Sequence, residues 1–348
     1  MTLAAFIKEM PKVELHVHLE GSIRPETLLV LAQRHRIPLP ATRVEELHDW
    51  YTFTDFAHFI EIYKTISRCL RTAEDIELIT REFLIGQAAQ NIVYSEVTFT
   101  PFSQYHASGL PFADQLAAVN RARTWAEMEL NVRMSLVIDI PREITPDEGL
   151  LVAGWAISAI GNGVVAFGLG GNEQGNPPEK FAAAFTRARL AGLPGVPHAG
   201  ETMGPASIWG ALKTLHAVRV GHGVRCLEDP ALVETLRHRR IPLEICPTSN
   251  VCLKVVPSLE AHPLPRLLAE NLVVTLNSDD PPMFNTTLTD EFLRCGQCFG
   301  LDVAAIELLA LNAVNSSLLP EADRKNLEDH FKTDFARLRS KHHLTETA

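Results

Sequence analysis

The chain lacks the features of a membrane or nucleic-acid-binding protein. No apolar run in the sequence approaches the roughly 18 residues that a membrane-spanning helix needs. Acidic residues outnumber basic ones by 42 to 32, and the formal net charge of −10 argues against nucleic acid or an anionic membrane as a partner. The first fifteen residues do not combine a basic start, a long apolar stretch and a small-residue cleavage site, so no signal peptide is predicted.

Cysteine is sparse and scattered. The six cysteines in 348 residues do not have the density of a disulfide framework. One CxxC pair, Cys295 and Cys298, follows a helical pattern, and we expect these two cysteines to pack in the fold rather than serve redox or metal chemistry. We therefore expect a reducing, cytoplasmic location.

Several catalytic and nucleotide-binding motifs are also missing. No Walker motif and no G-x-S-x-G sequence occurs. The "GLGG" at 168–171 lacks the spacing of a dinucleotide fingerprint and begins no phosphate-binding helix. Its small residues would instead let a flat ligand approach backbone N–H groups.

What recurs along the chain is a strand-like apolar run followed by a helical pattern. The strand-like runs are 12–19, 91–99, 133–139, 164–171, 195–201, 219–223, 242–250 and 273–281, and the helical patterns include 74–90, 112–129, 178–191, 205–215, 229–239 and 258–270. This alternation predicts a (β/α)₈ TIM barrel forming a single domain over 1–348, with a doubly wound open sheet as the alternative. Nearly every run ends in a polar or small residue, and a barrel would bring all these ends to one mouth, so we favour the barrel.

Two segments go beyond a minimal barrel. The first lies between the first and second runs and includes 53–66, where aromatic and aliphatic residues at near-helical spacing predict a helix. That helix either packs on the barrel or forms a hydrophobic lid over its mouth. The second segment, 301–340, is predicted to add helices at the C-terminus.

A histidine pair in the first run, His16 and His18, is unusual for a core strand. Residues i and i+2 of a strand point to the same side, so both rings project together from positions roughly 7 Å apart along the backbone. His198 and Asp279 end two other runs. Three imidazoles and one carboxylate suit Zn²⁺, which would lower the pKa of a bound water towards 7. No lysine lies in 164–171 to bridge a second ion, so we expect one metal per chain.

Further polar residues at the strand ends are candidates for the chemistry. Glu201 lies three residues after His198, and a carboxyl in a closed site can shuttle protons. His222 could orient the attacking oxygen. Beside Asp279, Asp280 could accept a hydrogen bond from substrate. This set suits hydrolysis at the amidine-like carbon of a heterocycle with loss of ammonia, and amide or ester hydrolysis remains an alternative.

The motifs resemble those of the adenosine deaminase family of metal-dependent barrels. They are "MPKVELHVHLEGSIRPETLL", "HAGET", "RVGHGVR", "CPTSN" and "NSDDPPMF", and the resemblance covers residues 7–340 in order. The cytidine-deaminase type of zinc site is not indicated, because its H-x-E and P-C-x-x-C motifs do not occur together.

The resemblance implies a role for each motif residue. The zinc ligands of the family are matched by His16, His18, His198 and Asp279. Glu201 matches the group that protonates ring N1, and His222 matches the residue that orients hydroxide. Asp280 matches the contact to N7, and Gly171 matches the N–H donor near N3. His18 and Glu20 are also placed at the substrate. The implied activity is hydrolytic deamination of a purine nucleoside, adenosine or 2′-deoxyadenosine, to an inosine-type product and ammonia.

Glu20 departs from the adenosine-specific pattern. Vertebrate-type members have Asp at this place, whereas Glu is common in other branches, including those that act on free adenine. The motifs also look like those of bacterial members that act on adenosine or on aminodeoxyfutalosine, a menaquinone precursor with an aromatic group on its 5′ side. Deamination of aminodeoxyfutalosine or adenine is therefore an alternative, as is, less strongly, a non-catalytic nucleoside-binding protein.

Overall fold

The strands of the protein close into a parallel barrel. In the computed structural model, which describes residues 2–344, the strands are β1 (Lys12–His18), β2 (Ile92–Phe99), β3 (Arg133–Pro141), β4 (Val164–Gly170), β5 (His198–Ala199), β6 (Val220–His222), β7 (Leu243–Ile245) and β8 (Val274–Leu276). They form two four-stranded sheets, ordered β1-β2-β3-β4 and β5-β6-β7-β8. Parallel bridges from Phe167 to Gly195 and from Val17 to Asp279 join the sheets at both edges. The TIM-barrel prediction is confirmed.

The later strands are shorter than the apolar runs that predicted them. The run 242–250 forms a strand only over Leu243–Ile245, after which the chain turns into a short helix that begins at Pro247. Proline lacks an N–H for the sheet and has the φ of a first helical residue, so it favours this change. The helical pattern 258–270 is likewise helical only over its second half, at Leu264–Ala269.

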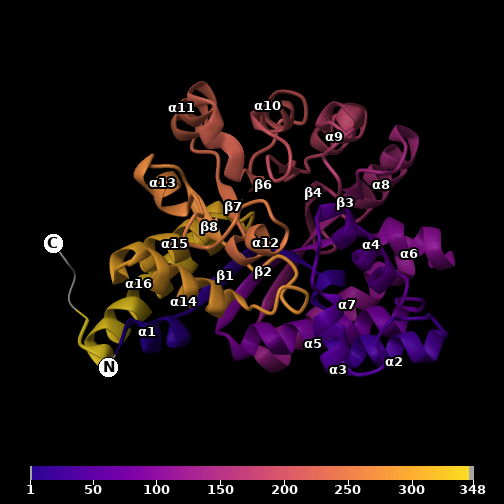
Figure 1. Ribbon diagram of the computed structural model, residues 1–348, viewed down its shortest axis with the longest axis horizontal. Coiled ribbons are helices and arrows are strands. Elements are labelled where there is room, and N and C mark those ends of the chain that lie inside the picture. The colour runs from indigo at the N-terminus through magenta and orange to yellow at the C-terminus, as the bar shows by residue number, and fades with distance from the viewer. Residues whose placement is uncertain (1, 345–348) are drawn as a thin grey trace.

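Helices lie around the barrel and beside its mouth. They are α1 (Leu3–Glu9), α2 (Pro25–His35), α3 (Val44–Trp50), α4 (Phe56–Ser67), α5 (Ala73–Ala89), α6 (Pro101–Ser108), α7 (Phe112–Leu130), α8 (Pro146–Ser158), α9 (Ala182–Leu190), α10 (Pro205–Lys213), α11 (Pro230–Arg239), α12 (Pro247–Cys252), α13 (Leu264–Ala269), α14 (Leu288–Phe299), α15 (Val303–Ser316) and α16 (Glu321–His342). Figure 1 shows α8 to α11 in an arc outside the strands. None of the helices described is both long enough and apolar enough for a membrane span.

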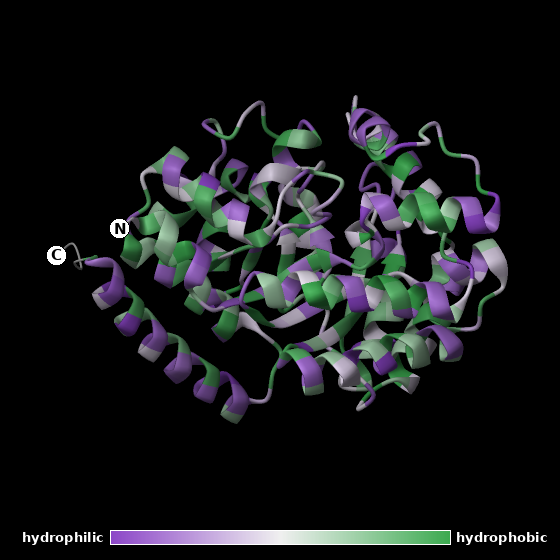
Figure 2. Ribbon diagram, turned by 90° about the horizontal axis from the view of Figure 1, so that it is seen from below, coloured by the Kyte–Doolittle hydropathy of each residue, from purple (hydrophilic) through white to green (hydrophobic). Residues whose placement is uncertain are grey.

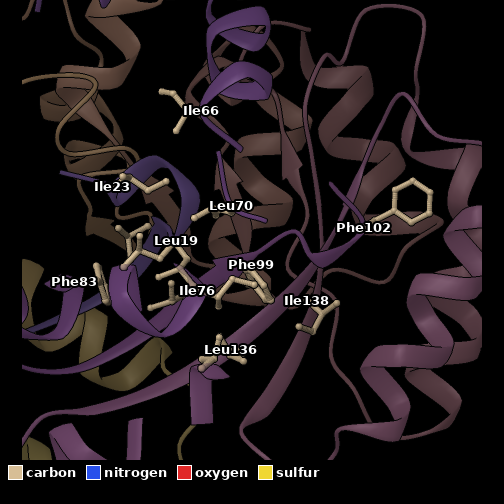
Figure 3. Close-up of a cluster of buried hydrophobic side chains, with 14 of the residues drawn as sticks. Leu19, Ile23, Ile66, Leu70, Ile76, Phe83, Phe99, Phe102, Leu136 and Ile138 are labelled. Carbon is tan, nitrogen blue, oxygen red and sulfur yellow. The ribbon is translucent and has the colours of Figure 1, made fainter. Parts of the chain in front are cut away.

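The segment between β1 and β2 packs into the main hydrophobic core. Leu19 and Ile23 follow β1, Ile76 and Phe83 belong to α5, and all four share one buried cluster with strand residues such as Leu136 (Figure 3). Helix α4 contributes Phe59, Ile62 and Ile66 to the same cluster. The segment predicted at 53–66 as a packed helix or lid is therefore mostly helical and lies against the barrel.

The N-terminal and C-terminal helices lie together. The rings of Phe6 in α1 and Phe335 in α16 are 5.9 Å apart, and Lys341 forms an ion pair with Glu9 at 2.6 Å. Helix α16 is coloured hydrophilic along most of its length in Figure 2, and its buried residues are few. The C-terminal helices thus close the side of the barrel away from α2 to α4.

Candidate metal centre and active site

The ends of β1 and β5 and the turn after β8 bring four metal-binding side chains together. His16, His18, His198 and Asp279 each offer one ligand atom, and these atoms all lie within 4.8 Å of one another. Asp279 Oδ1 is 3.4 Å from His16 Nε2 and 3.3 Å from His18 Nε2. His18 Nε2 is 3.1 Å from His198 Nε2. The four predicted ligands therefore meet at one point.

Backbone pairing with β1 aims the Asp279 carboxylate at the cluster. Its N–H donates to the carbonyl of His16 at 3.1 Å, and its carbonyl accepts from the N–H of His18 at 2.9 Å. Asp279 also adopts φ 64°, in the left-handed region that few non-glycine residues occupy. Such backbone conformations gather at functional sites, where surrounding contacts hold them in place.

Hydrogen bonds at the far side of two rings orient them for a metal ion. His16 Nδ1 lies 2.9 Å from Glu244 Oε2, and His198 Nδ1 lies 3.0 Å from the carbonyl of Leu169. Each acceptor favours a proton on Nδ1 and turns the Nε2 lone pair toward the cluster. His16 Nε2 is buried and has no hydrogen-bond partner. A divalent ion would satisfy this nitrogen, and the three-nitrogen, one-oxygen set suits zinc.

Glu201 is held by a second carboxylate. Glu173 accepts hydrogen bonds from the backbone N–H groups of Gly200, Glu201 and Thr202 at 2.9 to 3.0 Å. Glu201 itself is only 4 % exposed. Burial raises the pKa of Glu201 well above its usual range, and the charges of Asp279 and Glu173 raise it further. The carboxyl can therefore carry a proton at neutral pH, as a general acid must.

His222 lies beside both groups. Its Nε2 is 3.8 Å from Glu201 Oε1 and 3.9 Å from Asp279 Oδ2. Burial lowers the pKa of His222 to about 3, so the ring is neutral at physiological pH. A second possible metal-binding group combines His222 with His16, Cys246 and Asp279. Geometry alone therefore allows His222 to be either a ligand or a hydrogen-bond partner.

Asp280 projects into the same space. Its Oδ1 is buried and has no hydrogen-bond partner, and burial together with Asp279 raises its pKa well above the usual range. Gly21, in the turn after β1, makes this placement possible. A Cβ atom at Gly21 would lie 1.6 Å from Asp280 Oδ1, far inside van der Waals contact.

Replacing Gly21 with alanine is expected to displace the Asp280 side chain. Because the φ of Gly21 is not in the left-handed region, the cause would be the contact and not backbone strain. We expect kcat/KM to fall by at least tenfold, which corresponds to about 1.4 kcal/mol, while bound metal is retained. Measuring turnover and metal content together tests this. Gly86, whose Cβ would meet no atom within 4 Å, is the matched control for Gly→Ala.

A cavity of about 460 Å³ opens from the cluster toward α4 and α6. The predicted site residues that line it are His18, Gly171, His198, Glu201, His222, Asp279 and Asp280. Gly171 adopts φ 95°, a conformation that favours glycine and lets the chain pass close to a ligand. The sequence-predicted residues thus converge on one cavity, apart from His16, which lies behind it, and Glu20.

Glu20 lies outside the cavity lining that the described residues form. It is fully buried, and its carboxylate accepts hydrogen bonds from the Thr100 N–H at 3.0 Å and from Gln104 Nε2 at 3.3 Å. The Tyr63 hydroxyl lies 3.5 Å from its other oxygen. Tyr63 and Thr100 do line the cavity. An influence of Glu20 on substrate therefore stays a prediction, and these two neighbours would transmit it.

Sequence reasoning missed two of the supporting carboxylates. Glu173 follows β4 in the sequence "GGNEQG", and Glu244 stands inside the apolar strand "PLEIC". A charged residue in a buried strand was a usable signal for Glu244, because an unpaired carboxylate there would be costly. Arg219 pairs with it at 2.5 Å. Glu173 offered no comparable signal, since polar residues are ordinary in loops.

Comparisons with known proteins agree with this geometry. The family model described as adenosine deaminase matches residues 11–334. An aminodeoxyfutalosine deaminase of Streptomyces coelicolor is 41 % identical over 333 residues, covering 95 % of this chain and 86 % of the relative.

Two solved structures share the fold. An adenine deaminase from Arthrobacter aurescens has a TM-score of 0.89 and 34 % identity, covering 94 % of this chain and 99 % of that one. An amidohydrolase from Burkholderia ambifaria, described with bound zinc, has a TM-score of 0.90 and 26 % identity, covering 98 % and 95 %. The chain therefore belongs to the adenosine deaminase family of hydrolases, which act on C–N bonds.

Proposed function

We propose that the protein hydrolyses a 6-aminopurine to a 6-oxopurine and ammonia, with one zinc ion per chain. The observation that carries this proposal is the meeting of the four-ligand cluster, Glu201 and Asp280 at the inner end of one cavity. A zinc ion held by that cluster would supply an activated water as the nucleophile.

The remaining residues would bind the purine and move the protons. Glu201, protonated because it is buried, would donate to ring N1 as water adds to C6. Asp280, also protonated because it is buried beside Asp279, would donate to N7 and would not accept a hydrogen bond as its sequence position suggested. The N–H of Gly171 would bind near N3. These contacts to the ring edges follow the family resemblance. They support purine deamination over hydrolysis of an amide or ester, which would not need three donors arranged around a flat ring.

The outer part of the cavity supports a purine with a large group on its 5′ side. Phe56, Phe59 and Ile60 of α4 line it, opposite Phe102 and other residues of α6. Lys64 and Arg68 add positive charge. A free base would occupy the inner end and leave this apolar wall uncovered. We therefore propose aminodeoxyfutalosine as the preferred substrate, in line with the Streptomyces coelicolor relative, ahead of adenosine or 2′-deoxyadenosine.

Free adenine is a second candidate. The Arthrobacter aurescens structure is that of an adenine deaminase, and an adenine deaminase of Cupriavidus necator is 39 % identical to this chain. Such a substrate would use the same inner groups. It would make no use of the α4 and α6 wall.

A substrate panel with one cavity variant separates these candidates. We expect kcat/KM to rank aminodeoxyfutalosine above adenosine and adenosine above adenine, by change in ultraviolet absorbance. Ser103→Phe, which fills the outer cavity, is expected to lower kcat/KM for aminodeoxyfutalosine by at least tenfold, about 1.4 kcal/mol, and to spare adenine. Ser108→Phe, on the exposed face of the same helix, is the control. Highest activity on adenine would refute the substrate assignment, and no turnover of any purine would refute deamination.

A further inference from the structure

A chain of hydrogen bonds runs from the start of α13 to His222. The backbone N–H of Leu264 donates to His262 Nδ1 at 3.0 Å. His262 Nε2 lies 3.2 Å from Asn250 Oδ1, and Asn250 Nδ2 lies 3.2 Å from His222 Nδ1. His222, Asn250 and His262 are 1 %, 0 % and 3 % exposed, so water has little access to these contacts.

The direction of every bond in this chain follows from its first donor. A backbone N–H can only donate, so His262 Nδ1 must accept and the ring proton of a neutral His262 must be on Nε2. That proton is donated to Asn250 Oδ1. The Asn250 amide nitrogen is then the atom that faces His222, and it donates to His222 Nδ1. The only ring proton of a neutral His222 is therefore on Nε2.

The reverse arrangement is excluded by valence. If the Asn250 amide were flipped, its nitrogen would donate to His262 Nε2 while Leu264 still donated to Nδ1. Both ring nitrogens of His262 would then be acceptors, which requires an imidazole anion. Neither ring can carry protons on both nitrogens, because Nδ1 of each ring faces a donor: the Leu264 N–H at His262 and the Asn250 amide at His222. Only one direction of donation along this chain of hydrogen bonds is therefore possible.

We propose that Asn250 and His262 are positioning residues that hold His222 as the Nε2–H tautomer, so that it acts as a hydrogen-bond donor and not as a metal ligand. This proposal rests on the proposed function for its catalytic meaning. The Nε2–H faces the region between Glu201 Oε1 and Asp279 Oδ2, at 3.8 and 3.9 Å. There it would donate to the attacking water and direct a lone pair of that oxygen at C6.

The proposal also decides between the two possible metal-binding groups. A metal ion needs a lone pair from each imidazole. The lone pair of His222 is on Nδ1 and is engaged by Asn250, whereas its Nε2 carries hydrogen. The group that includes His222 and Cys246 is therefore left without a lone pair from His222 and keeps only three of its four ligands. The group formed by His16, His18, His198 and Asp279 keeps all four.

Nitrogen-15 NMR of the zinc-loaded protein, labelled at histidine, tests the tautomer without substrate. We expect the His222 signals to show a protonated Nε2 and an unprotonated Nδ1, with His222→Gln used only to identify them. A protonated Nδ1 in the wild-type protein, or signals typical of a zinc-bound His222, would overturn the proposal. The measurement does not depend on turnover, so it separates failure of this proposal from failure of the proposed function.

Three substitutions test the chain of hydrogen bonds. Asn250→Asp leaves only acceptors facing His222, so we expect the ring proton of His222 to shift to Nδ1. We expect kcat to fall by at least tenfold with little change in KM. His262→Gln still offers an acceptor to Leu264 and a donor to Asn250, so we expect it to keep the wild-type tautomer and most of kcat. His262→Leu should lose both the wild-type tautomer of His222 and most of kcat. Equal activity and identical nitrogen signals in His262→Gln and His262→Leu would also overturn the proposal.

Discussion

Replacing Glu201 with glutamine is expected to lower kcat by about 10²–10⁴-fold, the usual contribution of general acid–base catalysis. The amide has nearly the shape of the protonated carboxyl, but it cannot give a proton to ring N1 and then recover it. The backbone N–H of residue 201 would still donate to Glu173, so the loop would keep its position. The metal ligands are untouched, and bound zinc should remain at one ion per chain.

Turnover, metal content and thermal unfolding of Glu201→Gln should be measured on the same preparation. Glu143→Gln is a suitable control, because Glu143 also lines the cavity but is exposed to solvent. We expect Glu143→Gln to keep near wild-type turnover. Near-normal turnover by Glu201→Gln would show that another group transfers the proton. Loss of zinc from that variant would contradict the expectation that Glu201 transfers protons without helping to hold the metal.

Strand periodicity explains why part of the site was predictable. His16 and His18 are two residues apart on one strand, so their common direction follows from local geometry alone. The alternation of strands and helices then predicted the convergence of His198 and Asp279 with them, since the strand ends of a barrel share one mouth. For this reason the fold and the location of the cluster could be predicted from the sequence.

Backbone turns and long-range contacts could not be predicted from the sequence in the same way. Asp279 and Asp280 lie beyond the end of β8, and the direction of Asp279 depends on its φ of 64° and its pairing with β1. No strand pattern encodes that turn. The close approach of Gly21 and Asp280 joins residues that are far apart in the sequence, so only the tertiary structure could show it. Whether α4 moves as a lid stays a prediction, since packing in one conformation does not measure motion.

Removing the metal is expected to abolish turnover and to destabilise the folded protein. Without the ion, Asp279 is the only acidic side chain among the four buried ligands. The Nε2 atoms of His18 and His198 lie 3.1 Å apart, and His16 Nε2 has no hydrogen-bond partner. A ligand that binds only the folded state stabilises it by about 4 kcal/mol when present at 1,000 times its dissociation constant. Dialysis against a chelator should therefore lower Tm, and one equivalent of zinc should restore both Tm and activity.

Asp279→Asn separates binding of the ion from the shape of the site. The amide preserves the backbone pairing with β1 but removes the charge that draws a cation to three neutral imidazoles. We expect this variant to bind zinc weakly and to show a Tm that the chelator barely changes. Its kcat/KM should fall by at least about 10²-fold, the upper end of the roughly 10–100-fold loss seen when a residue that only supports a metal ligand is removed. Asp290→Asn, at the N-terminal turn of α14 and away from the cluster, is the charge-matched control. A resident metal ion would be contradicted if the chelator did not change the Tm of the wild-type protein and zinc were well below one per chain. A cluster this buried gains its stability from the ion that it holds.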